Sequence, residues 1–340
     1  MILYNIFLII LLPLALFFFY IKNKNFFFDQ AQKLSHKQFT SSKKHTPLLG
    51  GWIVLYGVFF FLDYEIEFKI IFSLIFLIGF LSDIFILKKA IIKLFLQTIT
   101  ILIFIIYFDL KVNRSGIFFL DQLLNFDLFN YFFVIFCFIV LINGSNFIDG
   151  VNTNLLGYYF ILLLIIFFTA ENNNLEFNPN LIKILMLFIF FALTLNFFGI
   201  IFTGDAGAYS ISFLIGSQLI NFTNNNEIIS PLFVVLLLWY PAFEGLFSLI
   251  RKKIENKSAM LPDINHLHQL IFLFFKNKYK LKNNILNTLT GMSLNFYNLS
   301  IFMLGINYFN NPIMLFTLII INMLVYIYIT SKLRNCLFKN

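Results

Sequence analysis

Long apolar runs alternate with short polar segments along almost the whole chain. A helix that crosses the hydrocarbon core of a bilayer needs about 20 mostly apolar residues. The pattern therefore predicts an all-α, polytopic membrane bundle. We expect about eleven transmembrane helices, near residues 2–21, 47–62, 68–85, 91–108, 130–148, 153–170, 181–200, 208–221, 230–250, 286–306 and 312–331.

Composition narrows the class of protein. Of the 340 residues, 60% are hydrophobic and only 12% are charged, which excludes an ordinary soluble globular domain. No polar stretch is long enough for a separate soluble domain, so residues 1–340 are expected to form one membrane-embedded domain. The stretch from Met1 to Tyr20 lacks a basic start and a small-residue cleavage site, and it is therefore expected to be a membrane helix.

The net charge of +8 becomes informative once the basic residues are located. Threading the predicted helices alternately through the bilayer gathers nearly all lysines and arginines on one side, chiefly in segments 22–46, 251–285 and 332–340. Basic loops remain in the cytoplasm, so the N-terminus is predicted outside and the C-terminus inside. Anionic lipid or an anionic substrate explains this excess, and no nucleic-acid partner is needed.

The polar stretch from Asn143 to Asn154 separates two apolar runs. Its residues Asn146, Asp149 and Asn152 recur every three positions, which places them on one side of a helical turn. A carboxylate at the edge of a membrane usually faces a wet, functional cavity. Taken alone, the stretch is equally compatible with a short turn between helices.

Two further acids lie at predicted inner helix ends. Asp83 ends one helix shortly before Lys93 and Gln97, and it is either functional or a helix end paired with a nearby lysine. Asp205 stands between glycines at a helix start, where it is either an N-cap or a carboxylate accessible to a divalent ion with bound phosphate.

The last long inner segment carries His266 and His268 beside a basic run. No third soft ligand accompanies them, so phosphate binding is favoured over a metal site. Earlier in the chain, Glu244 and Arg251 are spaced two helical turns apart and are expected to form an ion pair. On the predicted topology, these histidines, the acids of the preceding paragraphs and Lys43 all lie at the inner face, which indicates one cytoplasmic-side site.

These blocks, in this order, resemble the polyprenyl-phosphate N-acetylhexosamine-1-phosphate transferases of glycosyltransferase family 4, which include the muramoyl-pentapeptide phosphotransferase. The resemblance covers residues 43–268, and residues 286–331 add C-terminal helices. It depends on the blocks Thr46–Gly51, Gly79–Asp83 with Lys93 and Gln97, Asn146–Gly150, Gly204–Gly207, Pro241–Glu244 with Arg251, and His266–His268.

The resemblance implies transfer of an N-acetylhexosamine 1-phosphate from a UDP-sugar to a polyprenyl phosphate, with release of UMP, at the cytoplasmic face of a bacterial inner membrane. It implies Mg²⁺, with Mn²⁺ as an alternative, held by Asp205. Asp83 would orient the attacking phosphate or the ion. Asn146 and Asp149 would line the diphosphate site, and further substrate contacts would come from Lys43, Asn152, Asn196, His266 and His268. Whether the chain acts as a homodimer stays open.

Three positions depart from the family pattern. Ser82 replaces the first of two paired aspartates, Asn152 replaces an acid, and Gln269 replaces a histidine. A lapsed homologue is therefore one alternative, and a polytopic lipid or solute carrier is another. A carrier would place charged residues near the bilayer midplane at broken helices. Here the polar residues are predicted at the inner boundary, which favours the enzyme.

Overall fold

The structure is a computed structural model that describes residues 46–256 and 265–338. Within these ranges the chain is helical, and its only extended pairing is an isolated bridge between Leu48 and Phe202. The predicted all-α bundle is confirmed. Its helices are α2 (Gly50–Phe61), α3 (Ile66–Asp83), α4 (Ala90–Phe108), α5 (Phe118–Leu124), α6 (Asp127–Ile148), α7 (Asn154–Asn172), α8 (Pro179–Phe197), α9 (Gly204–Asn225), α10 (Pro231–Leu237), α11 (Trp239–Ile254), α12 (Leu267–Lys278), α13 (Asn283–Ile306) and α14 (Pro312–Phe338).

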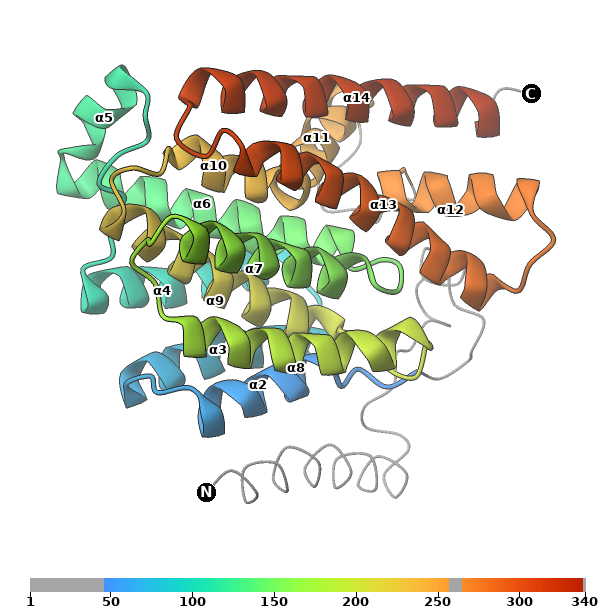
Figure 1. The fold of residues 1–340 in the computed structure, drawn as a ribbon. Coiled ribbons are helices and arrows are strands. Elements are labelled where there is room, and N and C mark those ends of the chain that lie inside the picture. The colour runs from blue at the N-terminus through green and yellow to red at the C-terminus, as the bar shows by residue number, and fades with distance from the viewer. Residues whose placement is uncertain (1–45, 257–264, 339–340) are drawn as a thin grey trace.

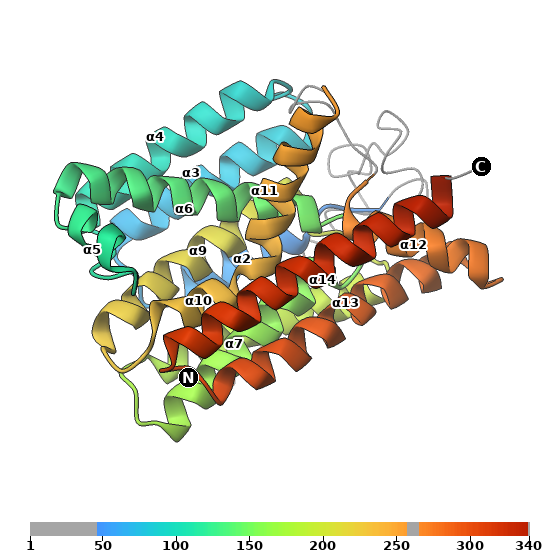
Figure 2. The ribbon, with the colours of Figure 1, turned by 90° about the horizontal axis from the view of Figure 1, so that it is seen from above.

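Helix α9 is the centre of the bundle and packs against α2, α3 and α6 (Figure 1). Small residues allow this close packing. A Cβ atom at Gly79 of α3 would lie 2.5 Å from the Ala206 Cα, and one at Gly51 of α2 would lie 2.6 Å from the Gly207 nitrogen. Because no side chain intervenes, the end of α3 and the starts of α2 and α9 meet backbone to backbone. Figure 2 shows α4 and α14 on opposite sides of this centre.

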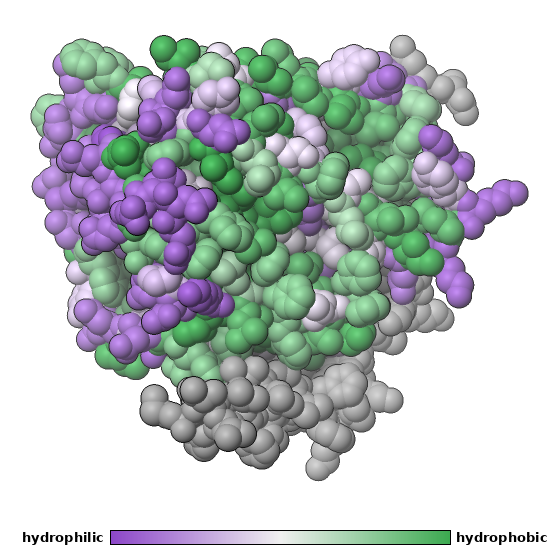
Figure 3. All heavy atoms as spheres, viewed as in Figure 1, coloured by the Kyte–Doolittle hydropathy of each residue, from purple (hydrophilic) through white to green (hydrophobic). Residues whose placement is uncertain are grey.

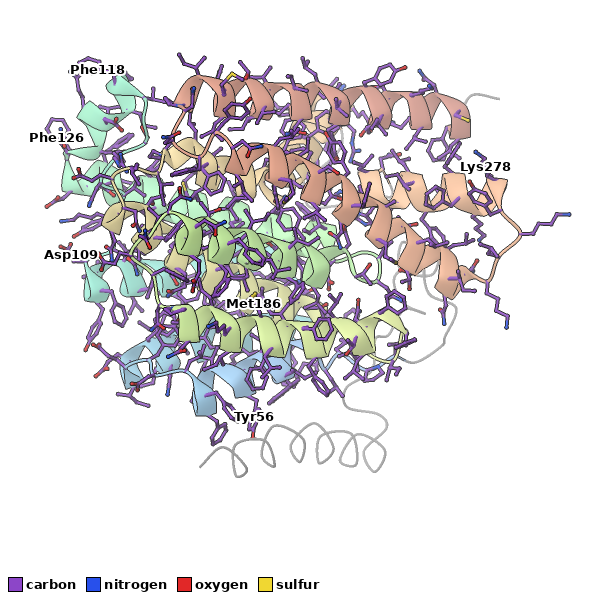
Figure 4. All side chains as sticks on the ribbon, in the orientation of Figure 1. Tyr56, Asp109, Phe118, Phe126, Met186 and Lys278 are labelled. Carbon is purple, nitrogen blue, oxygen red and sulfur yellow. The ribbon has the colours of Figure 1, made fainter. Side chains whose placement is uncertain are left out.

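The surface is that of a membrane protein. Six described helices are long and apolar enough to cross a membrane, or seven if α10 and α11 form one bent span. Hydrophobic residues cover the middle of the molecule between two ends that carry hydrophilic ones (Figure 3). Asp109 lies at one end and Lys278 at the other (Figure 4).

The prediction of eleven spans is confirmed only in part. Ten of the predicted segments fall within the described residues, and each overlaps at least one helix. Helix α2 has only 12 residues, however, so it is too short to cross a bilayer by itself. The segment 2–21 lies outside the described residues, and the orientation of the two termini stays a prediction.

The predicted continuous helix over 230–250 is wrong, because the chain bends by 70° between α10 and α11. The physical reason is Pro241, which has no N–H to donate to the carbonyl of Leu237. The Tyr158 hydroxyl donates to that carbonyl instead, at 2.7 Å. A second difference is α12, which lies between the predicted segments 230–250 and 286–306, where no helix was expected.

Candidate functional site

Asp83 and Asp205 meet where α3 ends and α9 begins. The Asp83 carboxylate accepts hydrogen bonds from the backbone N–H groups of Asp205, at 2.9 Å, and Ala206, at 3.0 Å. Gly204 precedes them with φ +75°, and a Cβ there would lie 2.7 Å from Asp83 Oδ2. Asp83 therefore caps α9 from a neighbouring helix, where its charge also complements the helix dipole. The N-cap role considered for Asp205 is filled by Asp83, and the Asp205 carboxylate is left for other contacts.

Those contacts come from Ser82 and Lys93. The Ser82 hydroxyl donates to Asp205 Oδ2 at 2.5 Å, and the Lys93 ammonium donates to the Ser82 hydroxyl. Lys93 Nζ also lies 3.6 Å from Asp205 Oδ2, with 22% of the lysine side chain and 17% of the aspartate side chain exposed. The sequence had singled out Lys93 and Ser82 separately, but not their joint contact with Asp205.

A second polar group lies against α9, one turn beyond Asp205. The Asn146 amide donates to the Tyr209 hydroxyl at 3.2 Å, and the Asn143 amide donates to Gln97 Oε1 at 3.0 Å. Three residues after Asn146, the half-buried Asp149 follows the last residue of α6. The structure thus places Asn146 beside the helix that carries Asp205, as a shared site requires.

Asn152 and Asn196, by contrast, are buried and hold the turn between α6 and α7. Asn196 accepts from the Thr153 backbone N–H at 2.6 Å and donates to the Ile201 carbonyl at 2.9 Å. Asn152 donates from its amide to the Thr288 hydroxyl at 3.3 Å. These contacts fix the turn at Thr153, whose φ of +66° is unusual for a β-branched residue. The structure gives both asparagines contacts inside the protein. Their predicted contact with substrate stays a prediction.

His266 is held by a carboxylate and an aromatic ring. Its Nδ1 lies 2.8 Å from Glu244 Oε1, and its ring stacks on Phe147 at a centroid distance of 5.2 Å. The expected Glu244–Arg251 ion pair is not among the contacts of the described residues, where Glu244 pairs with His266. Because Phe147 follows Asn146, this stacking joins the histidine segment to the Asn146–Gly150 block.

His268 is buried, with 1% of its surface exposed. A Cβ at Gly150 would lie 2.0 Å from its Nε2, so only glycine allows this approach. Burial is the main reason that the pKa of His268 falls to about 3. The ring is therefore neutral near pH 7 and cannot act as a cation toward phosphate. In the segment's first turn, Gln269 accepts from the His266 backbone N–H at 3.3 Å, which explains a glutamine here structurally.

Asp205 fits a magnesium ion that arrives with a substrate. Among the described residues, no three histidine, cysteine, aspartate or glutamate side chains lie together as a metal site. Mg²⁺ in phosphate chemistry is usually held by one or two carboxylates, with substrate phosphates and water completing its shell. The half-buried Asp205 suits that mode of binding and not a closed protein cage.

Lys43, which was predicted to contact substrate, lies outside the described residues.

The central part of the chain is similar to a known protein family. Residues 67–223 match the family model described as glycosyl transferase family 4. The matched region runs from α3 to α9 and includes both Asp83 and Asp205, whereas His266 and His268 lie beyond it. No curated protein gives a match to the chain.

Proposed function

Because residues 67–223 match the family model described as glycosyl transferase family 4, we propose that the chain transfers an N-acetylhexosamine 1-phosphate from a UDP-sugar to a polyprenyl phosphate. The observation that carries this proposal is the meeting of Asp83 and Asp205, from α3 and α9, at one end of an apolar bundle. A site at that end is open to water-soluble nucleotide sugar and to a lipid phosphate in the bilayer. Both substrates are anionic, which is compatible with the basic excess of the chain.

The chemistry asks mainly for positioning and charge neutralisation. An oxygen of the lipid phosphate forms a bond to the phosphorus that carries the sugar. The bond from that phosphorus to the oxygen shared by the two phosphates of the UDP-sugar breaks, and UMP leaves with that oxygen. A phosphate monoester has its second pKa near 6, so its oxygen is largely deprotonated at neutral pH. When bound, Mg²⁺ at Asp205 would neutralise charge on the diphosphate. Ser82 therefore need not be a general base.

The residues of the chain have separate tasks in this proposal. Asp83 holds the start of α9 and so fixes where Asp205 lies. Asn146 and Asp149 line the diphosphate side, and Lys93 supplies a positive charge. His266, oriented by Glu244, donates a hydrogen bond to the diphosphate or the sugar. We place this site at the cytoplasmic face of a bacterial inner membrane, because the predicted topology puts the basic segments on the same side as Asp83 and Asp205.

The direct test is turnover by the full chain in lipid nanodiscs. We expect UMP release from one or more UDP-N-acetylhexosamines only when undecaprenyl phosphate and Mg²⁺ are both present. Release that continues without the lipid phosphate would indicate simple hydrolysis of the nucleotide sugar. If no sugar of a broad UDP panel supports release, the transferase proposal fails.

A carrier is the second candidate, because the bend between α10 and α11 is a broken helix within the bundle. Broken helices often form the substrate sites of transporters, and the buried Glu244 lies shortly after this break. The two functions separate in proteoliposomes. A carrier moves a solute without cleaving it, whereas the transferase releases UMP in proportion to the lipid product.

A further inference from the structure

The contact between Lys93 and Asp205 is built by the turn that joins α3 to α4. The Leu81 carbonyl accepts backbone hydrogen bonds from Ile86, at 2.9 Å, and Leu87, at 3.0 Å. Phe85 adopts φ +62° within this turn. These contacts fold the start of α4 back on the end of α3, and they bring Lys93 to Ser82. The position of Lys93 is thus set by the backbone of this turn.

Each carboxylate in this cluster has its charge balanced by the chain itself. Asp83 faces two backbone N–H groups at the positive end of α9. Asp205 faces the Lys93 ammonium, both directly and through the Ser82 hydroxyl. Both members of this ion pair are largely shielded from water, so their attraction is screened less than that of a surface pair.

We propose that Lys93 is a built-in counter-cation of Asp205 and that a divalent ion binds this carboxylate in competition with it. Ser82 acts as a positioning residue that links the ammonium to Asp205. An aspartate at position 82 would offer Lys93 a second carboxylate, whereas the neutral serine directs the ammonium toward Asp205. The inference rests on the proposed function only in the use of a divalent ion.

The competition has a consequence for substrate binding. An ammonium that leaves Asp205 becomes available to the oxygens of a phosphate. Phosphate should therefore draw Lys93 away and strengthen divalent-ion binding, and the ion should strengthen phosphate binding by the same factor. The protein would bind the metal weakly alone and more tightly together with an anionic substrate.

The test measures metal binding without turnover. Free Mn²⁺ is followed by electron paramagnetic resonance as it is titrated into the substrate-free full chain, and Mg²⁺ is used as a competitor. We expect Lys93→Met to lower the Mn²⁺ dissociation constant about tenfold, the size of one charge-assisted contact. Ser82→Ala, which removes no charge, should lower it by a smaller factor. Addition of UMP should tighten Mn²⁺ binding in the wild type more than in Lys93→Met.

Two controls keep the outcomes distinct. Lys89→Met removes an exposed lysine that also lies at the start of α4, and it should change the Mn²⁺ affinity by less than about twofold. Asp205→Asn should abolish the measured site in every background. The proposal is overturned if Lys93→Met and Ser82→Ala bind Mn²⁺ with unchanged or weaker affinity. It is also overturned if Asp205→Asn still binds Mn²⁺ as the wild type does. If no UDP-sugar is turned over but the competition is observed, the proposed function fails and this inference stands.

Discussion

The two ends of the bundle each carry a lysine among aspartates, but the two clusters differ in origin and exposure. At one end, Lys111 Nζ lies 3.0 Å from Asp109 Oδ1 and 3.2 Å from Asp127 Oδ1, with 69% and 71% of the aspartate side chains exposed. At the other end, Lys93 lies 3.6 Å from Asp205, and both side chains are mostly buried. The more exposed cluster therefore has the shorter distances.

Burial and sequence separation, and not distance, distinguish the cluster around Lys93 from the cluster around Lys111. The cluster around Lys111 draws on residues 109–131, which are close in the sequence, and water screens its charges. The cluster around Lys93 joins α3, α4 and α9, and one of its hydrogen bonds links residues 123 positions apart. Bringing three helix ends together around shielded charges costs stability, so this arrangement needs a functional explanation.

The largest expected effect separates the two ends directly. Asp205→Asn keeps the size of the side chain but removes the charge that would hold Mg²⁺, so UMP release should fall by at least about a hundredfold. Asp127→Asn, its matched control at the opposite end, should stay within about twofold of wild type. Both variants should elute and melt like the wild type. A comparable loss in Asp127→Asn would show that the comparison does not identify the site.

The next effect concerns the histidine segment at the end of the bundle where we propose the site. His266→Ala removes the ring that Glu244 orients, and we expect it to raise the KM for the UDP-sugar about tenfold, the size of a hydrogen bond to a charged group. The KM for polyprenyl phosphate should stay unchanged. Steady-state kinetics with each substrate varied in turn measures both constants.

A matched control is Glu255→Gln, which breaks the Arg334–Glu255 ion pair of 2.6 Å near the same end. That variant should leave both KM values unchanged. If His266→Ala raised only the KM for the lipid, the segment would have to be assigned to the acceptor side.

A third prediction uses the buried His268. Its folded-state pKa is about 3, mainly because of burial, whereas the unfolded value is near 6.5. The unfolded chain therefore binds the proton more readily than the folded protein. The contribution of neutral His268 to the free energy of unfolding is fully present above about pH 6.5. It is lost as pH falls toward 3, by up to about 1.4 kcal/mol per pH unit.

Melting temperatures of the detergent-solubilised protein between pH 8 and pH 5 test this prediction. The wild type should lose stability over the lower part of this range, and His268→Gln should show a shallower slope. Equal slopes in the two proteins would mean that another group causes the loss.

Much of the fold could be predicted from the sequence because each membrane helix needs a long run of apolar residues. When those runs cross the bilayer in alternating directions, Asp83 and Asp205 lie on the same side, and their proximity could be predicted. The bend before α11 was missed because its apolar run is continuous and only Pro241 marks it. Helix α12 was missed because its 12 residues are too few to span a membrane. The structural role of Asn196 could not be predicted, since its partner Thr153 lies 43 positions away in the chain.

The smallest expected effect is at Lys111, and it sharpens the comparison most. Hydrogen bonds to Asp109 and Asp127 raise the pKa of Lys111, and hydrogen bonds from Lys111 and Tyr131 lower the pKa of Asp109. The carboxylate contribution is therefore present above the unfolded pKa near 4 and disappears in acid. Because the aspartates face water, we expect Lys111→Met to leave UMP release within about twofold and to shift the melting temperature by no more than about 2 °C. The same measurements at 0.05 and 0.5 M salt should narrow even that difference, since salt screens exposed pairs. A large loss of activity or stability in Lys111→Met would mean that exposure is no guide to which of the two clusters does the chemistry.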